Sequence, residues 1–232
     1  MDLLLPFLVP IEFVKGFFFS HRGREHVTVF GSARFGSDHA HYDVGMQTGR
    51  AIYEAGASIL TGGGPGLMEA ANRGFLDARN GDKRYSRNAQ PRRESLGINI
   101  LIHTEQRAND YLDRFFVARY FFVRKYFLFH YGKAFVFLPG GFGTLDELSE
   151  VLTLMRTRKI QERPIILVGT KFWSGFVDWI RVALEDGGAV VPPHTPQWLV
   201  TDSFEEVRAR LAAIMNETAK SRALPQATLG KS

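Results

Sequence analysis

The sequence of 232 residues contains no cysteine. Disulfide bonds, thiolate metal sites and cysteine nucleophiles are therefore excluded. The excess of positive over negative charge is also small, because 29 Lys and Arg residues against 24 Asp and Glu residues give a formal net charge of +5. This balance favours an anionic partner, which could be a phosphorylated metabolite, a nucleic acid or a membrane surface, and charge alone does not choose among them.

An uninterrupted apolar run long enough to cross a membrane is missing as well, although residues 1–26 form an apolar N-terminal extension. Pro6, Pro10 and Glu12 interrupt this extension, and Asp2 stands where a secretory signal would carry basic residues. We expect the extension to pack on the protein or on a partner subunit, with association to a membrane surface as the alternative. The expected location is the cytoplasm.

From Val27 onward, short apolar runs alternate with longer stretches of helical periodicity. This alternation predicts a single-domain α/β fold, a doubly wound, Rossmann-like parallel sheet with helices on both faces. We expect this domain to span 27–216, followed by a flexible tail at 217–232. The expected strands are Val27–Phe30, Ser58–Leu60, Leu96–Ile102, Ala134–Leu138 and Pro164–Val168. The expected helices are Asp38–Ala55, Leu67–Ala78, Phe115–Tyr131, Thr144–Met155, Phe172–Leu184 and Phe204–Met215.

Residues 79–94 break this rhythm, because Lys and Arg side chains recur there among almost no apolar ones. The segment predicts an exposed basic insertion, with a contact to nucleic acid or polyphosphate as the alternative. No stacking motif accompanies the charges to support nucleic-acid binding. We therefore expect a small molecule, and not a nucleic acid, as the partner.

The strongest local motif, PGGFGT, spans Pro139–Thr144 directly after an expected strand and opens an expected helix. Glycines let backbone amides approach an anion closely, and the following helix adds unpaired N–H groups and the positive end of its dipole. A tight turn without a ligand is the alternative, but such a turn does not need three glycines and a threonine. No Lys-Ser or Lys-Thr pair follows Gly143, so the motif is not a Walker loop.

Two further turns are expected at the same edge of the sheet. Ser32 follows the first strand, while the glycine turn Gly62–Gly64 follows the second strand and Met68 lies just inside the next helix. Because parallel strands end at one edge, the three turns together predict a nucleotide-sized pocket. The spacing of the second turn departs from the dinucleotide fingerprint.

Charged residues near this edge decide between binding and catalysis. Glu147 lies one turn into the helix that follows the PGGFGT motif, and Arg124 and Lys125 lie in an aromatic segment before the fourth strand. A surface carboxylate at a helix N-terminus and a structural ion pair are the alternatives, and the residue types leave both open.

These motifs resemble those of the Lonely-guy (LOG) family. Pro139–Glu147 is similar to the family's PGGxGTxxE motif, and Arg124-Lys125 is similar to its upstream Arg-Lys pair. The resemblance covers roughly Val27–Val207 and is strongest to the longer bacterial branch, which has an N-terminal extension.

The resemblance implies a phosphoribohydrolase that cleaves the N-glycosidic bond of a purine nucleoside 5′-monophosphate, such as AMP or a cytokinin riboside monophosphate. It implies Glu147 and Arg124 as the catalytic pair, and neither a cofactor nor a metal ion. The phosphate and substrate contacts that we expect from the motifs and their positions are Gly140, Gly141, Phe142, Gly143, Thr144, Lys125, Ser32, Gly63, Gly64, Met68, Glu105, Gln106 and Asn109.

Family members are dimers or larger assemblies, so the resemblance also implies a homodimer or a larger homo-oligomer. The rival hypothesis is a non-catalytic carrier of a phosphorylated nucleotide or of the molybdenum cofactor, because related folds use a similar glycine-rich loop. The presence of both Glu147 and Arg124 favours the enzyme. Aromatic residues could serve a subunit interface or the core: Phe121, Phe122, Tyr126, Phe127 and Phe129.

Overall fold

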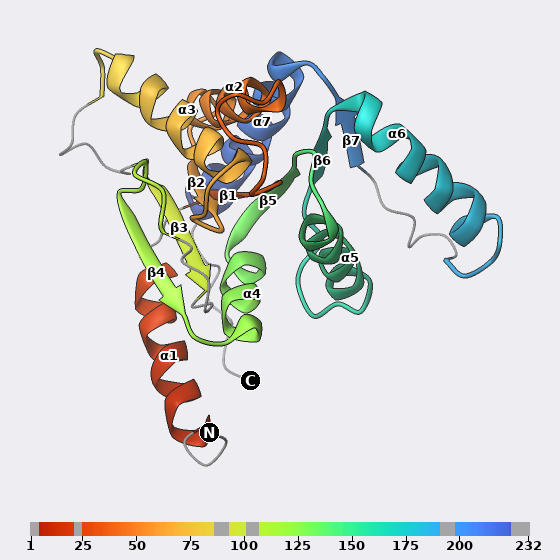
Figure 1. Ribbon diagram of the computed structural model, residues 1–232, viewed down its shortest axis with the longest axis horizontal. Coiled ribbons are helices and arrows are strands. Elements are labelled where there is room, and N and C mark those ends of the chain that lie inside the picture. Colours follow the sequence, from red (N-terminus) through yellow and green to blue (C-terminus); the bar gives the residue numbers. More distant parts are fainter. Residues whose placement is uncertain (1–4, 21–24, 86–92, 101–106, 191–197, 224–232) are drawn as a thin grey trace.

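The computed structural model describes residues 5–20, 25–85, 93–100, 107–190 and 198–223. A seven-stranded sheet runs through the described chain with the order β4-β3-β2-β1-β5-β6-β7, and all its strands are parallel (Figure 1). The doubly wound α/β fold predicted from the sequence is confirmed. The strands are β1 (His26–Phe30), β2 (Ser58–Thr61), β3 (Ser95–Ile100), β4 (Arg114–Ala118), β5 (Gly132–Phe137), β6 (Ile165–Val168) and β7 (Trp198–Thr201).

Helices cover both faces of this sheet (Figure 1). One face carries α2 (His41–Glu54), α3 (Leu67–Gly81) and α7 (Phe204–Ala223). The other face carries α1 (Leu5–Ser20), α4 (Phe121–His130), α5 (Phe142–Arg156) and α6 (Thr170–Trp179), which continues into a π-helical turn at Ile180–Glu185.

Strand side chains alternate between the two faces and so build two apolar cores. Val27 and Val29 of β1 pack toward α2, α3 and α7, whereas Phe30 packs toward α4 and α5. Phe30 stacks on Phe137 of β5 with ring centroids 4.9 Å apart. Because helices cover both sides, the central strands are buried at nearly every position and most of their residues are apolar, which is why their sequences predict them well.

The strand order reverses at β1, which lies between β2 and β5. Ligands of open α/β sheets bind outside the carboxyl ends of the strands at such a switch point. The loops that follow β1 and β5 meet there, because the Ser32 N–H donates to the Pro139 carbonyl at 3.1 Å. The fold therefore brings two of the three expected turns into direct contact.

The expected helix Phe115–Tyr131 is wrong. The segment instead forms strand β4, which ends at Ala118, and helix α4, which begins at Phe121. Exposure alternates along β4, where Phe115 and Val117 are exposed and Phe116 between them is half-buried. Aromatic and β-branched residues favour such a strand, and periodicity cannot assign a short apolar run.

Two further elements, β7 and α7, also differ from the expectation. Strand β7 is additional, and it is a four-residue edge strand too short to show a period. Helix α7 continues to Ala223, so the expected tail from 217 onward begins as a helix rich in good helix formers. Strand β3 is described from Ser95 to Ile100, and the last two residues of the expected strand, Leu101 and Ile102, lie outside the described part.

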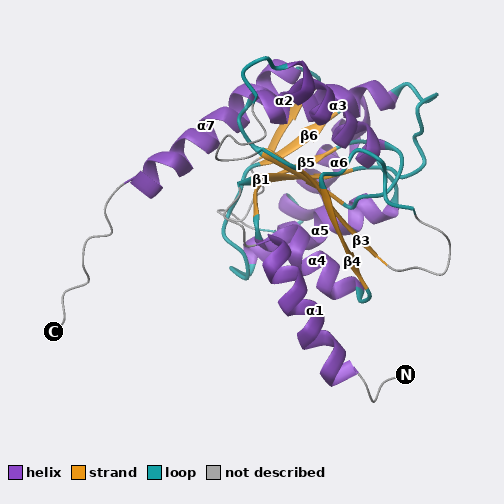
Figure 2. Ribbon diagram, turned by 90° about the vertical axis from the view of Figure 1, so that its left-hand side faces the viewer, coloured by secondary structure: helices purple, strands orange, loops and turns teal. Residues whose placement is uncertain are grey.

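The apolar N-terminal extension contains helix α1, which packs on α4 and β4 (Figure 2). Gly16 lies directly against the Phe127 ring, since a Cβ built on this glycine would be 2.1 Å from a ring carbon. Glu12 accepts the Arg119 N–H at 2.9 Å, just before α4 begins. The opposite side of α1 exposes large apolar side chains at Phe7, Ile11, Val14 and Phe18. Among the described residues, no helix is long and apolar enough to span a membrane.

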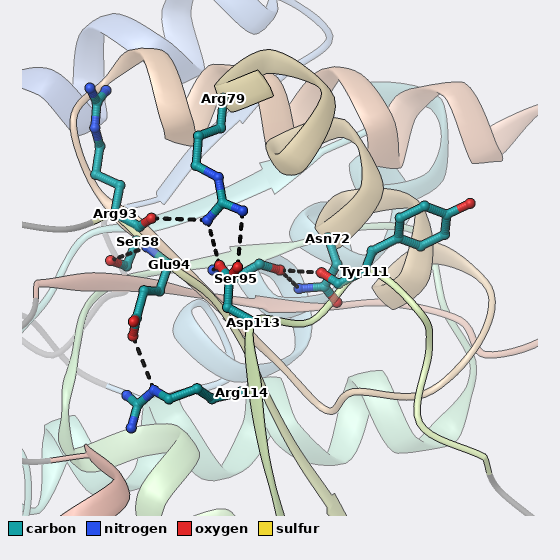
Figure 3. A network of polar contacts seen from close by, with 9 residues as sticks. All are labelled: Ser58, Asn72, Arg79, Arg93, Glu94, Ser95, Tyr111, Asp113 and Arg114. Carbon is teal, nitrogen blue, oxygen red and sulfur yellow. Dashed lines mark hydrogen bonds and ion pairs between the residues drawn. The ribbon is translucent and has the colours of Figure 1, made fainter. Parts of the chain in front are cut away.

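The start of the expected basic insertion is not an exposed loop. Helix α3 extends to Gly81, and Arg79 in its last turn is only 7% exposed. Its guanidinium donates two hydrogen bonds to Asp113, at 2.5 and 2.9 Å (Figure 3). An arginine can be buried here because a carboxylate receives it in bidentate geometry.

The end of the insertion is also fixed. Glu94 is 2% exposed and accepts a hydrogen bond from Arg114 Nε at 3.1 Å (Figure 3). The Arg93 guanidinium stacks over the Tyr53 ring at 4.1 Å. The interpretation of 79–94 as exposed is therefore wrong at Arg79 and Glu94, whereas Lys83 and Arg84 are exposed as expected and residues 86–92 lie outside the described part.

Candidate functional site

The PGGFGT motif forms the link between β5 and α5 and the first turn of that helix. Gly141 directly precedes α5, and none of the described side chains caps this end. A Cβ built on Gly141 or Gly143 would meet no atom of the described residues within 4 Å, so contacts with these residues do not require the glycines. Phe142 between them is 92% exposed. The first N–H groups of α5, which lack intrahelical partners, can therefore be approached by an anion.

Gly140 has a different reason to be glycine. A Cβ at this position would lie 2.1 Å from Thr144 Oγ1. Thr144 is 4% exposed and packs into the space that the missing side chain leaves. The loop therefore closes tightly on the first turn of α5, with Thr144 beneath its backbone.

The second glycine turn is held by its neighbours. Gly63 has φ +68°, a conformation that favours glycine. Its N–H donates to Thr61 Oγ1 at 2.9 Å, and its carbonyl accepts the Asn109 N–H at 3.0 Å. The Asn109 side chain donates to the Gly64 carbonyl at 3.0 Å. Asn109, expected as a substrate contact, thus uses its amide to hold the turn.

Arg124 connects this turn to helix α5. Its side chain is 13% exposed, and its Nε donates to the Ile98 carbonyl at 3.1 Å. A Cβ on Gly62 would lie 2.4 Å from Arg124 Nη2 and 2.7 Å from Met68 Sδ, so both side chains rest on the glycine backbone. From there Arg124 Nη1 faces Glu147 Oε1 at 3.8 Å.

Glu147 is a nearly buried carboxyl group. Its side chain is 12% exposed, and among the described residues it accepts no hydrogen bond. Burial raises the pKa of Glu147 to about 7, because the positive charges of Arg124 and Lys125 offset the cost of burying the carboxylate only in part. The negative charges of Asp146 and Glu150 raise this pKa further. Glu147 can therefore change its protonation state near neutral pH.

Lys125 is turned away from the Arg124–Glu147 pair. Its Nζ donates to Asp146 at 2.7 Å and to Glu150 at 2.6 Å, both on α5. It lines a cavity of about 640 Å³ whose wall contains residues from α1, α4 and α5. Successive residues of a helix point about 100° apart, so two neighbours in sequence face different surroundings.

The remaining expected contacts divide into two groups. Ser32 is 8% exposed, and its Oγ accepts the Arg34 N–H at 3.1 Å, so its side chain stabilises the loop after β1. Glu105 and Gln106 lie outside the described residues. Among the residues that the structure describes, no cluster of three or more metal-ligating side chains is present.

The sequence reasoning missed Thr61 and Asn72. Both are fully buried, and Thr61 Oγ1 donates to Asn72 Oδ1 at 2.8 Å directly behind the glycine turn. A signal existed, because a threonine ends an otherwise apolar strand next to three glycines and an asparagine interrupts the apolar face of the next helix. Buried polar side chains at such places need hydrogen-bond partners.

A family model described as "Possible lysine decarboxylase" matches residues 68–211. Two curated proteins are similar to the chain. One is a bifunctional cytokinin biosynthesis protein of Fusarium pseudograminearum, 25% identical over 169 residues, which cover 69% of this chain and 34% of that protein. The other is the cytokinin riboside 5′-monophosphate phosphoribohydrolase LOG of Oryza sativa subsp. japonica, 29% identical over 160 residues, which cover 68% of this chain and 60% of the rice protein. The match thus spans less than two thirds of either relative.

Solved structures share the fold. A structural-genomics target matches 84% of this chain and 99% of its own, with a TM-score of 0.58 and 23% identity. A molybdenum cofactor carrier protein from Chlamydomonas reinhardtii matches 83% of this chain and 99% of its own, with a TM-score of 0.58 and 17% identity. A molybdenum cofactor binding protein from Rippkaea orientalis matches 88% of this chain and 99% of its own, with a TM-score of 0.52 and 19% identity.

Proposed function

Because the chain belongs to the LOG family, whose model carries the description "Possible lysine decarboxylase", we propose that it is a phosphoribohydrolase. Its proposed substrates are purine nucleoside 5′-monophosphates, either AMP or cytokinin riboside monophosphates. The reaction adds water across the N-glycosidic bond and releases the free base and ribose 5-phosphate. It needs no cofactor in this proposal.

One observation carries the proposal. Glu147 and Arg124 face each other at 3.8 Å, one on the helix that follows the first glycine loop and the other resting on the second glycine turn. A binding protein for a phosphorylated ligand needs the glycine loop but gains nothing from an unbonded carboxyl group that titrates near neutrality. Perturbed carboxyl groups of this kind are typical of catalytic sites.

The chemistry explains the carboxylate. Cleavage of an N-glycosidic bond builds positive charge on the ribose in the transition state. The ionised form of Glu147 can stabilise that charge or orient the attacking water, and its burial strengthens either effect. Arg124 can then have one of three roles: it neutralises the charge of Glu147, binds the nucleotide or stabilises the departing base.

The phosphate is assigned to the PGGFGT motif. The first N–H groups of α5, at Phe142, Gly143 and Thr144, have no intrahelical partners, and the helix dipole places partial positive charge there. The open space around Gly141 and Gly143 leaves room for a phosphate to approach the backbone. Specificity for monophosphates over nucleosides follows from this contact.

The assembly and the location stay predictions. We propose a homodimer or a larger homo-oligomer, and the exposed Phe121 and Phe122 on α4 and Phe142 at the start of α5 are the side chains that a second copy would cover. Light scattering after size-exclusion chromatography measures the mass directly. The proposed location is the cytoplasm.

The test is chromatographic detection of free base from a panel of nucleoside monophosphates and the matching nucleosides. Wild type is compared with Glu147→Ala and Arg124→Ala. We expect base release from monophosphates only, and its loss in both variants. Release from no nucleotide would overturn the proposal and favour the rival hypothesis of a carrier for a phosphorylated nucleotide or cofactor.

A further inference from the structure

A buried asparagine lies behind the second glycine turn. Asn72 on α3 is fully buried, and its Oδ1 accepts hydrogen bonds from Thr61 Oγ1 at 2.8 Å and from Asn109 Nδ2 at 3.1 Å. Its Nδ2 donates to Ser95 Oγ at 2.8 Å, toward the start of β3 (Figure 3). One side of this amide therefore serves the glycine turn, and the other side serves the sheet.

The turn side of Asn72 determines how Gly63 is held. The Thr61 hydroxyl has one proton and gives it to Asn72, so a lone pair of the same oxygen accepts the Gly63 N–H at 2.9 Å. Asn109, which is bonded to Asn72, holds the carbonyl groups of Gly63 and Gly64. The Asn72 carbonyl oxygen thus orients the Thr61 hydroxyl and the Asn109 side-chain amide, which both hold the turn.

The Gly62–Gly64 turn supports the side chain of Arg124. Among the described residues, its guanidinium donates one hydrogen bond to a backbone carbonyl, from Nε to the Ile98 carbonyl at 3.1 Å. Its Nη2 rests on Gly62, where a Cβ would be only 2.4 Å away. A shift of the Gly62 backbone therefore moves the end of the side chain that faces Glu147.

We propose that Asn72 is a positioning residue for the Arg124–Glu147 pair, and that it acts through Thr61 and the Gly62–Gly64 turn without touching the substrate. The catalytic consequence rests on the proposed function, whereas the geometric consequence does not. A displacement of about 1 Å in a catalytic group can lower a rate a hundredfold.

The two sides of Asn72 offer a matched set of variants. Asn72→Ala removes three hydrogen bonds at once and is expected to prevent folding, so Thr61→Val carries the test. Thr61→Val keeps the shape of the side chain and removes only the hydroxyl that bonds Asn72 and Gly63. Thr61→Ser keeps the hydroxyl. Ser95→Ala removes the bond from Asn72 on the sheet side and the bond that Ser95 Oγ donates to the Tyr111 carbonyl, and it leaves the hydrogen bonds of Thr61 and Gly63 in place.

The first measurement is kcat and KM for base release from AMP. We expect Thr61→Val to lower kcat at least tenfold and Thr61→Ser to restore most of it. Ser95→Ala is expected to lower the melting temperature while kcat for the folded protein stays at the wild-type value. A purely structural role for Asn72 predicts instead that Thr61→Val and Ser95→Ala affect only the melting temperature.

The second measurement needs no substrate. The carboxyl group of Glu147 is titrated by NMR in protein with ¹³C-labelled glutamate, and Glu147→Gln assigns its signal. The charged groups around Glu147 are Arg124 and Lys125 on α4 and Asp146 and Glu150 on α5. If Thr61→Val lets Arg124 move away, the pKa of Glu147 rises, by roughly one unit. Ser95→Ala is expected to leave it unchanged.

The two measurements separate the two proposals. A shifted Glu147 titration in Thr61→Val, together with no base release by wild type, overturns the proposed function and supports the positioning role. Equal behaviour of Thr61→Val and Ser95→Ala in both measurements overturns the positioning role, whatever the enzyme does.

Discussion

Two arginine–carboxylate pairs of this protein are both nearly buried but differ in how closely their charged groups are bonded. In the last turn of α3, Arg79 donates two hydrogen bonds to Asp113, and Asp113 also accepts the Ser95 N–H at 2.8 Å. At the carboxyl ends of the strands, Arg124 and Glu147 are 3.8 Å apart. The first pair is joined by two direct hydrogen bonds, whereas the charged atoms of the second lie beyond hydrogen-bond distance.

The difference appears in the protonation behaviour of the two pairs. Burial by itself would lower the pKa of Arg79, but the hydrogen bonds and charge of Asp113 raise it on balance. In the second pair the effect of burial outweighs the nearby positive charges, and the pKa of Glu147 is raised to about 7. A closely bonded pair stabilises the fold, whereas a spaced pair keeps donors and acceptors available for a ligand.

The largest expected effect is on catalysis at the spaced pair. Glu147→Gln keeps the shape of the side chain but cannot become an anion, so we expect kcat for base release to fall about a thousandfold. Single-turnover assays with AMP measure the loss. Glu150→Gln, three residues further along α5, is the matched control and is expected to keep most of the activity. More than a tenth of wild-type activity in Glu147→Gln would contradict this assignment.

The next effect is on stability at the Arg79–Asp113 pair. Arg79→Met removes the cation that donates two hydrogen bonds to the buried Asp113 carboxylate, which we expect to lower the free energy of unfolding by about 3–5 kcal/mol. Urea denaturation followed by circular dichroism measures it, and kcat per folded molecule should not change. Arg84→Ala, which removes a 91% exposed partner of Asp82, serves as the control and should leave the urea midpoint in place. If Arg79→Met abolishes activity at unchanged stability, the contrast between the pairs is wrong.

A smaller effect concerns stability against pH. Glu147 has a pKa of about 7 in the folded protein against 4.5 for the free side chain, so between these values the folded state binds the extra proton. Raising the pH through this window therefore favours unfolding, by at most about 3 kcal/mol. Glu147→Gln lacks this loss, and its stability relative to wild type should increase from pH 5 to pH 8. Equal pH dependence of the two urea midpoints would show that Glu147 titrates normally.

The smallest effect concerns rate against pH. If the ionised form of Glu147 is active, kcat should rise about tenfold per pH unit below its pKa and level off above about 7. The profile is measured with saturating AMP, so that titration of the free substrate does not contribute. A rate that falls as the pH rises through 7 would instead identify Glu147 as a general acid.

Much of the fold could be predicted because its central strands are short, apolar and bounded by glycine. The segment after β3 could not, since the aromatic run from Phe115 suits a strand and a helix equally and only pairing with β3 decides. Strand β7 escaped for a similar reason. It forms a strand because it pairs with β6, and no local sequence pattern predicts that pairing.

The site was predictable where one motif carries it and unpredictable where distant residues meet. The sequence indicates Glu147 and the PGGFGT loop, because helix and loop are contiguous. It treats Arg124 and Lys125 alike, although the helical twist sends them to different partners. The bonds of Asn72 to Thr61, Ser95 and Asn109 join separate elements, and no spacing rule predicts them.

The central place of β1 in the sheet has a consequence for synthesis of the chain. Val27 pairs with Ala134, which leaves the ribosome much later than Val27 does. The β1–β5 pairing cannot form before that strand emerges, and pairings between distant segments form slowly. Until then the apolar β1 is exposed on one edge, so the nascent protein depends on protection from aggregation for longer than a protein built from neighbouring strands.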